Sequence, residues 1–138
     1  MDKEFILRFL ADNPIFYLAN VHNGKPHVRA LRLYHADENG IIFHTSKSKD
    51  LYKQLVLNPE VELCFIDDTG NMQVRISGAV QFIEDENVKR EIVVKRDRLQ
   101  PWILQHGLNM FAVMKLVNGL AQIWEPELTF LPKRYIRL

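Results

Sequence analysis

The segment from His44 to Asp50 carries the side chains best suited to binding an anion. It reads His44-Thr45-Ser46-Lys47-Ser48-Lys49-Asp50 and lies where a predicted strand ends and a predicted helix begins. Backbone N–H groups at a helix N-terminus are free, and the helix dipole there favours negative charge. Three hydroxyl groups and two lysine ammonium groups would add to that effect. The segment therefore predicts a site for a phosphate group.

Ordinary helix capping is a second interpretation of the same residues. Ser46 or Ser48 is a good N-cap residue, and Asp50 suits the first turn of a helix. Capping does not require two lysines, however, and a lysine near a helix N-terminus is unfavourable unless an anion offsets its charge. Both interpretations stay open on the sequence.

A basic strand is the second candidate. In Pro26-His27-Val28-Arg29-Ala30-Leu31-Arg32, alternation places His27, Arg29 and Leu31 on one face. The planar guanidinium group of Arg29 suits an oxyanion or the edge of a ring. A solvated edge strand would explain the same residues.

Gln73 is the third candidate. Its side-chain amide offers a donor and an acceptor, which is the pair that the edge of a flavin ring would use. Gln73, Arg75 and Ser77 share one face of a predicted strand. Exposure to solvent explains these polar residues equally well.

Other kinds of site have no motif here. Four of the histidines, His22, His27, His35 and His44, fall in different turns and strands, without the spacing of a zinc site, so we predict no metal. The sequence has neither the glycine pattern of a dinucleotide-binding fold nor that of a nucleophile elbow. Its single cysteine, Cys64, lies in an apolar run and is expected to be a buried, inert thiol.

Length and composition favour one domain spanning residues 1–138. Hydrophobic residues make up 47% of the chain, enough for a core, and the net charge of +1 gives no general field for nucleic acid or an anionic membrane. The first residues do not resemble a secretion signal, and no apolar run is long enough to cross a bilayer. We expect a cytoplasmic protein.

The remaining pattern is that of short strands joined by turns. Turns are expected at His22–Lys25 and Asp37–Gly40, because Asn-Gly tolerates positive φ, and Gly78 is expected to mark a bulge or a bend. Helices are predicted at Lys3–Ala11, Ser48–Leu57 and Asp85–Leu99. Strands are predicted at Ile15–Val21, Pro26–His35, Ile41–Thr45, Glu60–Ile66 and Met72–Ile83, with a last hairpin formed by Met110–Leu116 and Leu120–Trp124 across Asn118-Gly119. The form of Pro101–Gly107 stays undefined.

Six or seven strands in successive hairpins favour antiparallel pairing, and closing the sheet removes its exposed edges. The predicted fold is therefore mostly β within the α+β class, an antiparallel split β-barrel with flanking helices.

The order of these motifs resembles the pyridoxamine 5'-phosphate oxidase-like, FMN-binding split-barrel family. The likeness extends from about Ile15 to Ile83 and is carried by five segments in order. They are Pro26-His27-Val28-Arg29, Gly40 to Thr45, Ser46-Lys47-Ser48-Lys49, Asn58-Pro59 and Gln73 to Gly78.

The resemblance implies a homodimer with FMN at the subunit interface. It implies that Arg29 and the backbone from Ala30 through Leu31 to Tyr34 lie along the flavin. His44 and Thr45 would stand at the ring and phosphate end, and Ser48 and Lys49 would hold the phosphate. Ser46 and Lys47 are candidates for the same phosphate as members of the anion-binding segment. Gln73 matches a glutamine that the family uses near the flavin.

Two departures bear on the substrate. The family's oxidases often have Arg-Lys where this chain has Ser48-Lys49, so Lys47 is a candidate substitute. Tyr34 stands where the vitamin B6 oxidases have a substrate lysine. We therefore expect an FMN-dependent oxidoreductase acting on a small substrate, with no catalytic residue singled out, rather than a true pyridoxamine 5'-phosphate oxidase. The alternatives are a non-catalytic flavin or haem binder and a deazaflavin-dependent reductase.

Overall fold

The successive strands close into a barrel in the computed structural model, which describes residues 1–138. The strands are β1 (Ile15–His22), β2 (Lys25–Asp37), β3 (Gly40–Ser46), β4 (Glu60–Ile66), β5 (Gln73–Ile83), β6 (Phe111–Trp124) and β7 (Tyr135–Arg137). They pair in the order β3-β2-β1-β4-β5-β6-β7, and β3 also pairs with β6. All pairings are antiparallel, so β1 to β6 form a closed barrel and β7 adds to one side. The predicted barrel with flanking helices is confirmed.

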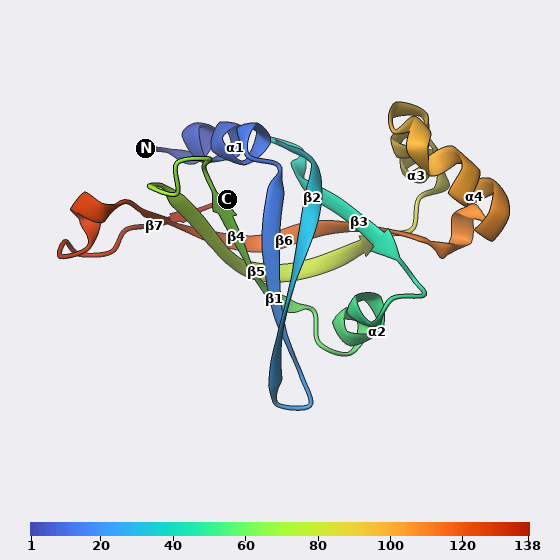
Figure 1. Cartoon of the computed structure of the whole chain (residues 1–138), viewed down its shortest axis with the longest axis horizontal. Helices are drawn as coiled ribbons and strands as arrows, with labels where there is room; N and C mark the ends of the chain where they lie inside the picture. The colour runs from blue at the N-terminus through green and yellow to red at the C-terminus, as the bar shows by residue number, and fades with distance from the viewer.

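Four α-helices flank the barrel: α1 (Lys3–Asp12), α2 (Asp50–Leu57), α3 (Glu86–Lys95) and α4 (Gln100–His106). Single 3₁₀ turns lie at Asp97–Leu99 (η1), Leu108–Met110 (η2) and Pro126–Leu128 (η3). Figure 1 shows α3 and α4 at one end of the long axis, α2 on the same side of the barrel but nearer its centre, and β7 toward the other end. None of these helices has the length and apolar character needed to cross a membrane.

The buried apolar residues form two clusters, one inside the barrel and one beneath α3. Inside the barrel the Phe16 ring stacks on Phe65 at 4.7 Å between ring centroids and meets Phe43 edge-on at 5.2 Å. A second, smaller cluster joins Ile42 and Phe111 to Ile92 and Val93 of α3. This cluster attaches the α3–α4 segment to β3 and β6, beside the end of β3 that carries the candidate site.

The predicted last hairpin is wrong, because β6 continues through Asn118-Gly119 as one strand. Asn118 adopts the left-handed conformation at φ 56°, and the register with β5 shifts there. Two residues of β6 thus face Gly78 alone, which is a β-bulge. A Cβ atom on Gly78 would lie 2.8 Å from the carbonyl oxygen of Val117. The expectation of a bulge or bend at Gly78 is confirmed.

Three further segments differ from expectation. The predicted helix 85–99 breaks at Arg96, whose φ of −120° and ψ of 80° are not helical. The undefined connection 101–107 forms most of α4, which has Pro101 in its first turn and is followed by Gly107, where φ is 89°. The end of the chain, for which no element is predicted, adds β7 beside Leu120–Gln122.

Candidate functional site

The N-terminus of α2 has no side-chain cap. Its N-cap residue is Lys49, whose side chain accepts no hydrogen bond from the helix. The hydroxyl groups of Ser46 and Ser48 instead lie 2.7 Å apart, and the Ser46 hydroxyl accepts from the Ser48 backbone N–H. Capping of α2 by Ser46 or Ser48 is therefore the wrong interpretation. The first turn of α2 keeps free N–H groups, with a lysine rather than an acceptor beside them.

Thr45, the neighbouring residue on β3, has a buried hydroxyl group without a partner. The residue is only 6% exposed, and its Oγ1 makes no hydrogen bond. A buried polar group left in this state costs about 1–3 kcal/mol. Thr45 lines two cavities beside α2, so a ligand with an acceptor there would satisfy this hydroxyl.

Arg29 is held beside α2 by two buried amides. Its Nη1 donates to Asn20 Oδ1 at 2.9 Å and its Nη2 donates to Gln54 Oε1 at 3.1 Å. Asn20 Nδ2 also donates to Gln54 Oε1, at 2.9 Å, which locks the two amides together. Both amide oxygens that accept from Arg29 are uncharged. The network therefore orients the guanidinium group without neutralising its charge.

These residues surround two adjoining cavities. The first, the α2 cavity, has a volume of about 530 Å³ and is lined by Arg29, Ala30, Leu31, Thr45, Ser48, Lys49, Asp50 and Leu51. The second, the α4 cavity, has a volume of about 330 Å³ and is lined by Ala30, Leu31, Arg32, His44, Thr45, Ser46, Lys49, Arg96, Arg98, Leu99, Trp102 and Phe111. The two cavities adjoin, because they share four lining residues. Arg29 and Lys49 supply positive charge in the α2 cavity, and the α4 cavity combines the rings of Trp102 and Phe111 with three arginines.

His44 lies in the wall of the α4 cavity and is uncharged at neutral pH. Its ring lies 4.9 Å from the Phe111 ring, and its Nε2 lies 2.9 Å from Arg96 Nη1. Burial, followed by the positive charges of Arg96, Arg98 and Lys49, lowers the pKa of His44 to about 4. Since arginine only donates, Nε2 is the acceptor in this bond and the ring proton sits on Nδ1.

Most of the predicted residues meet at these cavities, but three do not line them. The Lys47 ammonium group lies 3.6 Å from Glu84 and over the ring of Tyr52. Tyr34 packs its ring beneath the Arg96 guanidinium group, 5.2 Å from Arg96 Cζ. Lys47 is therefore already paired with a carboxylate inside the chain.

Gln73 lies on another part of the barrel. It starts β5, pairs with Ile66 and Trp124, and shares the outer face of the sheet with the exposed Arg75. Its Oε1 lies 3.8 Å from the Cys64 thiol, which is partly exposed rather than buried as expected. Burial nevertheless raises the pKa of this thiol above its ordinary value. Within one chain, Gln73 is three strands away from β2, roughly 14 Å at the usual strand spacing.

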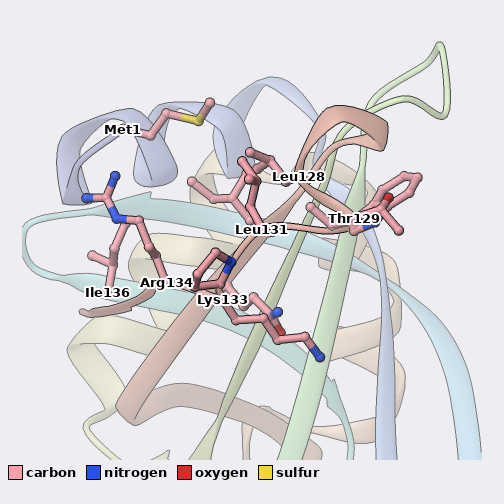
Figure 2. Close-up of a pocket in the computed structure, with 11 residues that line it drawn as sticks. Met1, Leu128, Thr129, Leu131, Lys133, Arg134 and Ile136 are labelled. Atoms are coloured by element: carbon pink, nitrogen blue, oxygen red, sulfur yellow. The ribbon is translucent and has the colours of Figure 1, made fainter.

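A separate cavity of about 520 Å³ lies near Gln73, between β6 and the end of the chain. Figure 2 shows Leu128 and Leu131 near Met1, with the Lys133 side chain extending away from Met1. Arg134 also lines this cavity, so the basic residues near the C-terminus lie away from α2. No group of three or more acidic, histidine or cysteine side chains is arranged to hold a metal ion.

Sequence reasoning missed Asn20, Gln54, Arg96, Arg98 and Trp102. Asn20 had a visible signal, because it follows Phe16 and Leu18 at an inward position of β1 where an apolar side chain is expected. Gln54 likewise lies on the face of α2 that buries Leu51 and Leu55. Arg96 and Arg98 lie at and after the end of α3, inside the segment 85–99 that was predicted as one helix. Trp102 lies in α4, in the connection whose form the sequence left undefined.

Comparison with known proteins identifies the family. The family model described as pyridoxamine 5'-phosphate oxidase matches residues 2–118. The chain belongs to this family. The match is wider than the segment 15–83 on which the resemblance in sequence rests, and it includes α3 and α4. The predicted family is confirmed.

Individual relatives are more distant. The chain is 29% identical over 97 residues to the pyridoxine/pyridoxamine 5'-phosphate oxidase of Blochmanniella pennsylvanica, an alignment covering 68% of this chain and 45% of that enzyme. It thus spans less than half of that enzyme's length.

Solved structures share the fold across nearly the whole chain. A NimC/NimA family protein from Clostridium acetobutylicum has a TM-score of 0.79 at 22% identity, covering 98% of this chain and 92% of that protein. A pyridoxamine 5'-phosphate oxidase-related, FMN binding protein from Nostoc punctiforme has a TM-score of 0.66 at 19% identity, covering 96% and 87%. At these identities the likeness concerns the fold.

Proposed function

We propose that this protein binds FMN in the joined α2 and α4 cavities and works as an oxidoreductase on a small substrate. The observation that carries the proposal is the unpartnered, buried hydroxyl of Thr45 beside the uncapped N-terminus of α2. A phosphate group has the acceptor oxygens and the negative charge that both features lack. The FMN binding protein of Nostoc punctiforme, which shares the fold, supports flavin as the ligand.

Residues of both cavities have the chemistry that FMN requires. Lys49, Ser48, Thr45 and Arg29 would hold the phosphate, with Asn20 and Gln54 keeping Arg29 in position. The backbone of β2 from Ala30 onward and the apolar walls of the α4 cavity would take the ring. FMN supplies hydride and electron transfer when bound, while the protein binds it, orients it and limits the access of water.

A homodimer is part of the proposal. The apolar residues of β6 do not support it, because Phe111 to Met114, Leu116 and Ala121 are already buried in this single chain. A better argument is the outer face of β1 and β2, where Ile15, Tyr17, Val21 and Val28 are between 44% and 68% exposed. Pairing of these faces about a twofold axis would cover them, and it would let Gln73 approach the partner's flavin.

Oxidation of vitamin B6 phosphates is not the activity that we propose. The basic residues near the C-terminus, which could imitate a substrate site, lie at the cavity beside β6 or, as with Arg137, on β7. Incubation of the FMN-loaded protein with pyridoxamine 5'-phosphate and oxygen should yield no pyridoxal 5'-phosphate. Turnover of about 1 per second or faster would overturn this part of the proposal.

The central test is titration of the flavin-free protein with FMN and FAD, followed by quenching of flavin fluorescence. Because the α2 cavity offers a site for one terminal phosphate and the chain has no dinucleotide motif, FMN should bind more tightly than FAD. Tighter binding of FAD, or no quenching by either flavin, would refute the proposal. Light scattering of the loaded protein tests the dimer, and a stable monomer with flavin bound would contradict it.

A further inference from the structure

Glu84, directly after the end of β5, holds two lysines from different elements through a single oxygen atom. Its Oε2 accepts a hydrogen bond from the Lys89 ammonium group of α3 at 3.2 Å and lies 3.6 Å from the Lys47 ammonium group. The Lys89 side chain is only 3% exposed and the Lys47 side chain 19% exposed. No other carboxylate pairs with either lysine, so Glu84 joins α3 to the segment that precedes α2.

Lys47 is the first residue of the short turn that connects β3 to α2. Its backbone N–H donates to the carbonyl oxygen of Met110 at 2.9 Å, and its side chain extends to Glu84. Ser48 and Lys49, the next two residues, line the α2 cavity, whereas Lys47 does not. The turn therefore presents its anion-binding residues to the cavity and is anchored elsewhere by Lys47.

Aromatic packing holds the anchor between α2 and β5. The Lys47 ammonium group lies 5.8 Å from the centroid of the Tyr52 ring of α2. That ring meets Phe82 of β5 edge-on, at 5.0 Å between centroids. A lysine beside an anion site would ordinarily be a candidate ligand for the anion, but here a carboxylate already balances its charge.

We propose that Glu84 is a positioning residue for the phosphate site. By holding Lys47, it fixes the turn so that Ser48, Lys49 and the free N–H groups of α2 face the cavity. Without the anchor the turn would have to be ordered when the phosphate binds, and that cost would lower the affinity. The inference rests on the proposed function, because it concerns the same anion site.

Simple electrostatics predicts the opposite effect for one substitution. Glu84→Gln removes a negative charge from the surroundings of an anion site. If charge alone mattered, the variant would bind a phosphate more tightly than the native protein does. If Glu84 acts through the position of Lys47, the variant binds the phosphate more weakly, so the direction of the change separates the two explanations.

The experiment is titration of the flavin-free protein with FMN, followed by quenching of flavin fluorescence, with urea unfolding to confirm that each variant is folded. Glu84→Gln and Lys47→Met should each weaken FMN binding at least fivefold. Because both break the same contact, the double variant should bind FMN within twofold of Lys47→Met alone. Lys47→Arg keeps the ion pair and should bind FMN within twofold of the native protein.

Two further variants control for stability and for net charge. Glu84→Gln leaves the buried Lys89 without a counter-charge, which costs stability. The double variant Glu84→Gln/Lys89→Met removes that cost, leaves the net charge of the chain unchanged and should still weaken FMN binding at least fivefold. Glu86→Gln is the matched control, because Glu86 is an exposed residue nearby that pairs only with Arg90. It should change FMN affinity less than twofold.

The inference is overturned if a folded Glu84→Gln or Glu84→Gln/Lys89→Met variant binds FMN as tightly as the native protein, or if Glu86→Gln weakens binding equally. Failure of the proposed function would look different, because the native protein itself would bind no flavin. The same variants would then be titrated calorimetrically with inorganic phosphate, and the same losses would support the positioning role of Glu84. Absence of phosphate binding by the native protein would overturn that role too.

Discussion

Replacing Gln54 by glutamate would separate the binding role of Arg29 from its structural role. Glutamate has nearly the same shape as glutamine, and its Oε1 can still accept from Arg29 Nη2 and Asn20 Nδ2, which lie 3.1 and 2.9 Å away in the native chain. The substitution therefore keeps the hydrogen bonds and adds one negative charge beside the guanidinium group. Gln54 is only 8% exposed, so the new pair would be poorly screened by salt.

The magnitude follows from these distances. Opposite charges about 4 Å apart attract by about 4 kcal/mol at an effective dielectric constant of 20, and the cost of burying the carboxylate offsets much of this. The free energy of unfolding should therefore change by less than about 1 kcal/mol. Binding of a phosphate should lose a charge-assisted contact of about 1.5–3 kcal/mol, because the Arg29 charge is already neutralised. The dissociation constant for FMN should rise roughly ten- to a hundredfold.

The assay pairs FMN fluorescence titration with urea unfolding of the flavin-free protein. Gln81→Glu is the control, because it adds the same charge at an exposed position of β5. Unchanged FMN affinity in a folded Gln54→Glu variant would refute the role given to Arg29, and an equal loss in Gln81→Glu would indicate only a general effect of net charge.

Three other substitutions test separate parts of the structure. Lys49→Ala should weaken FMN binding ten- to a hundredfold, because it removes a charge-assisted contact of about 1.5–3 kcal/mol. Lys53→Ala, on the exposed side of α2, should leave FMN binding unchanged, and equal effects of the two in titration would argue against a specific phosphate site. The pKa of His44 is about 4 in the folded chain and 6.5 ordinarily, so the unfolded chain binds a proton more readily. The stability that neutral His44 contributes above pH 6.5 is therefore lost as the pH falls through 4. Between pH 7 and 4.5 the free energy of unfolding, measured with urea, should therefore fall by about 2–3 kcal/mol less in His44→Gln than in the native protein. Identical falls in the two proteins would contradict the lowered pKa of His44. Gly78→Ala should destabilise the barrel by about 1–3 kcal/mol because its Cβ would meet the Val117 carbonyl oxygen, while the exposed Ser77→Ala should change unfolding by less than about 0.5 kcal/mol.

Local patterns were sufficient to predict most of the barrel. Alternation of apolar residues and the turn residues between them located β1 to β5 within a few residues. In the first turn, Asn23 and Gly24 adopt the positive φ that this prediction requires. The same rule failed at Asn118-Gly119, where the dipeptide forms a bulge inside β6. In the turn both Asn23 and Gly24 have positive φ, whereas in the bulge Asn118 does and Gly119 does not. Both settings use the tolerance of Asn for a left-handed conformation, and only the partner strands decide which setting occurs.

The site was partly predictable for a similar reason. The segment from Thr45 to Lys49 is contiguous, so its position between a strand and a helix was visible in the sequence. The pairing of Lys47 with Glu84 was not visible, because these residues meet only when β5 closes against β6 and β6 against β3. Arg96 was likewise hidden, since its partners on β2 and β3 are distant in the chain.

The pairing of β6 with three other strands also determines when the barrel can close. This strand contacts β5 along nearly its whole length, β3 through its first half and β7 through its second half. Until β6 is made, β3 and β5 are both open edges, which are templates for association with other chains. During synthesis the first hundred residues must therefore wait as an incomplete sheet, and contacts such as Ser46 with Phe111 close one of its longest loops. We expect barrel closure to be the slow step of folding, and chains interrupted before Phe111 to aggregate rather than fold.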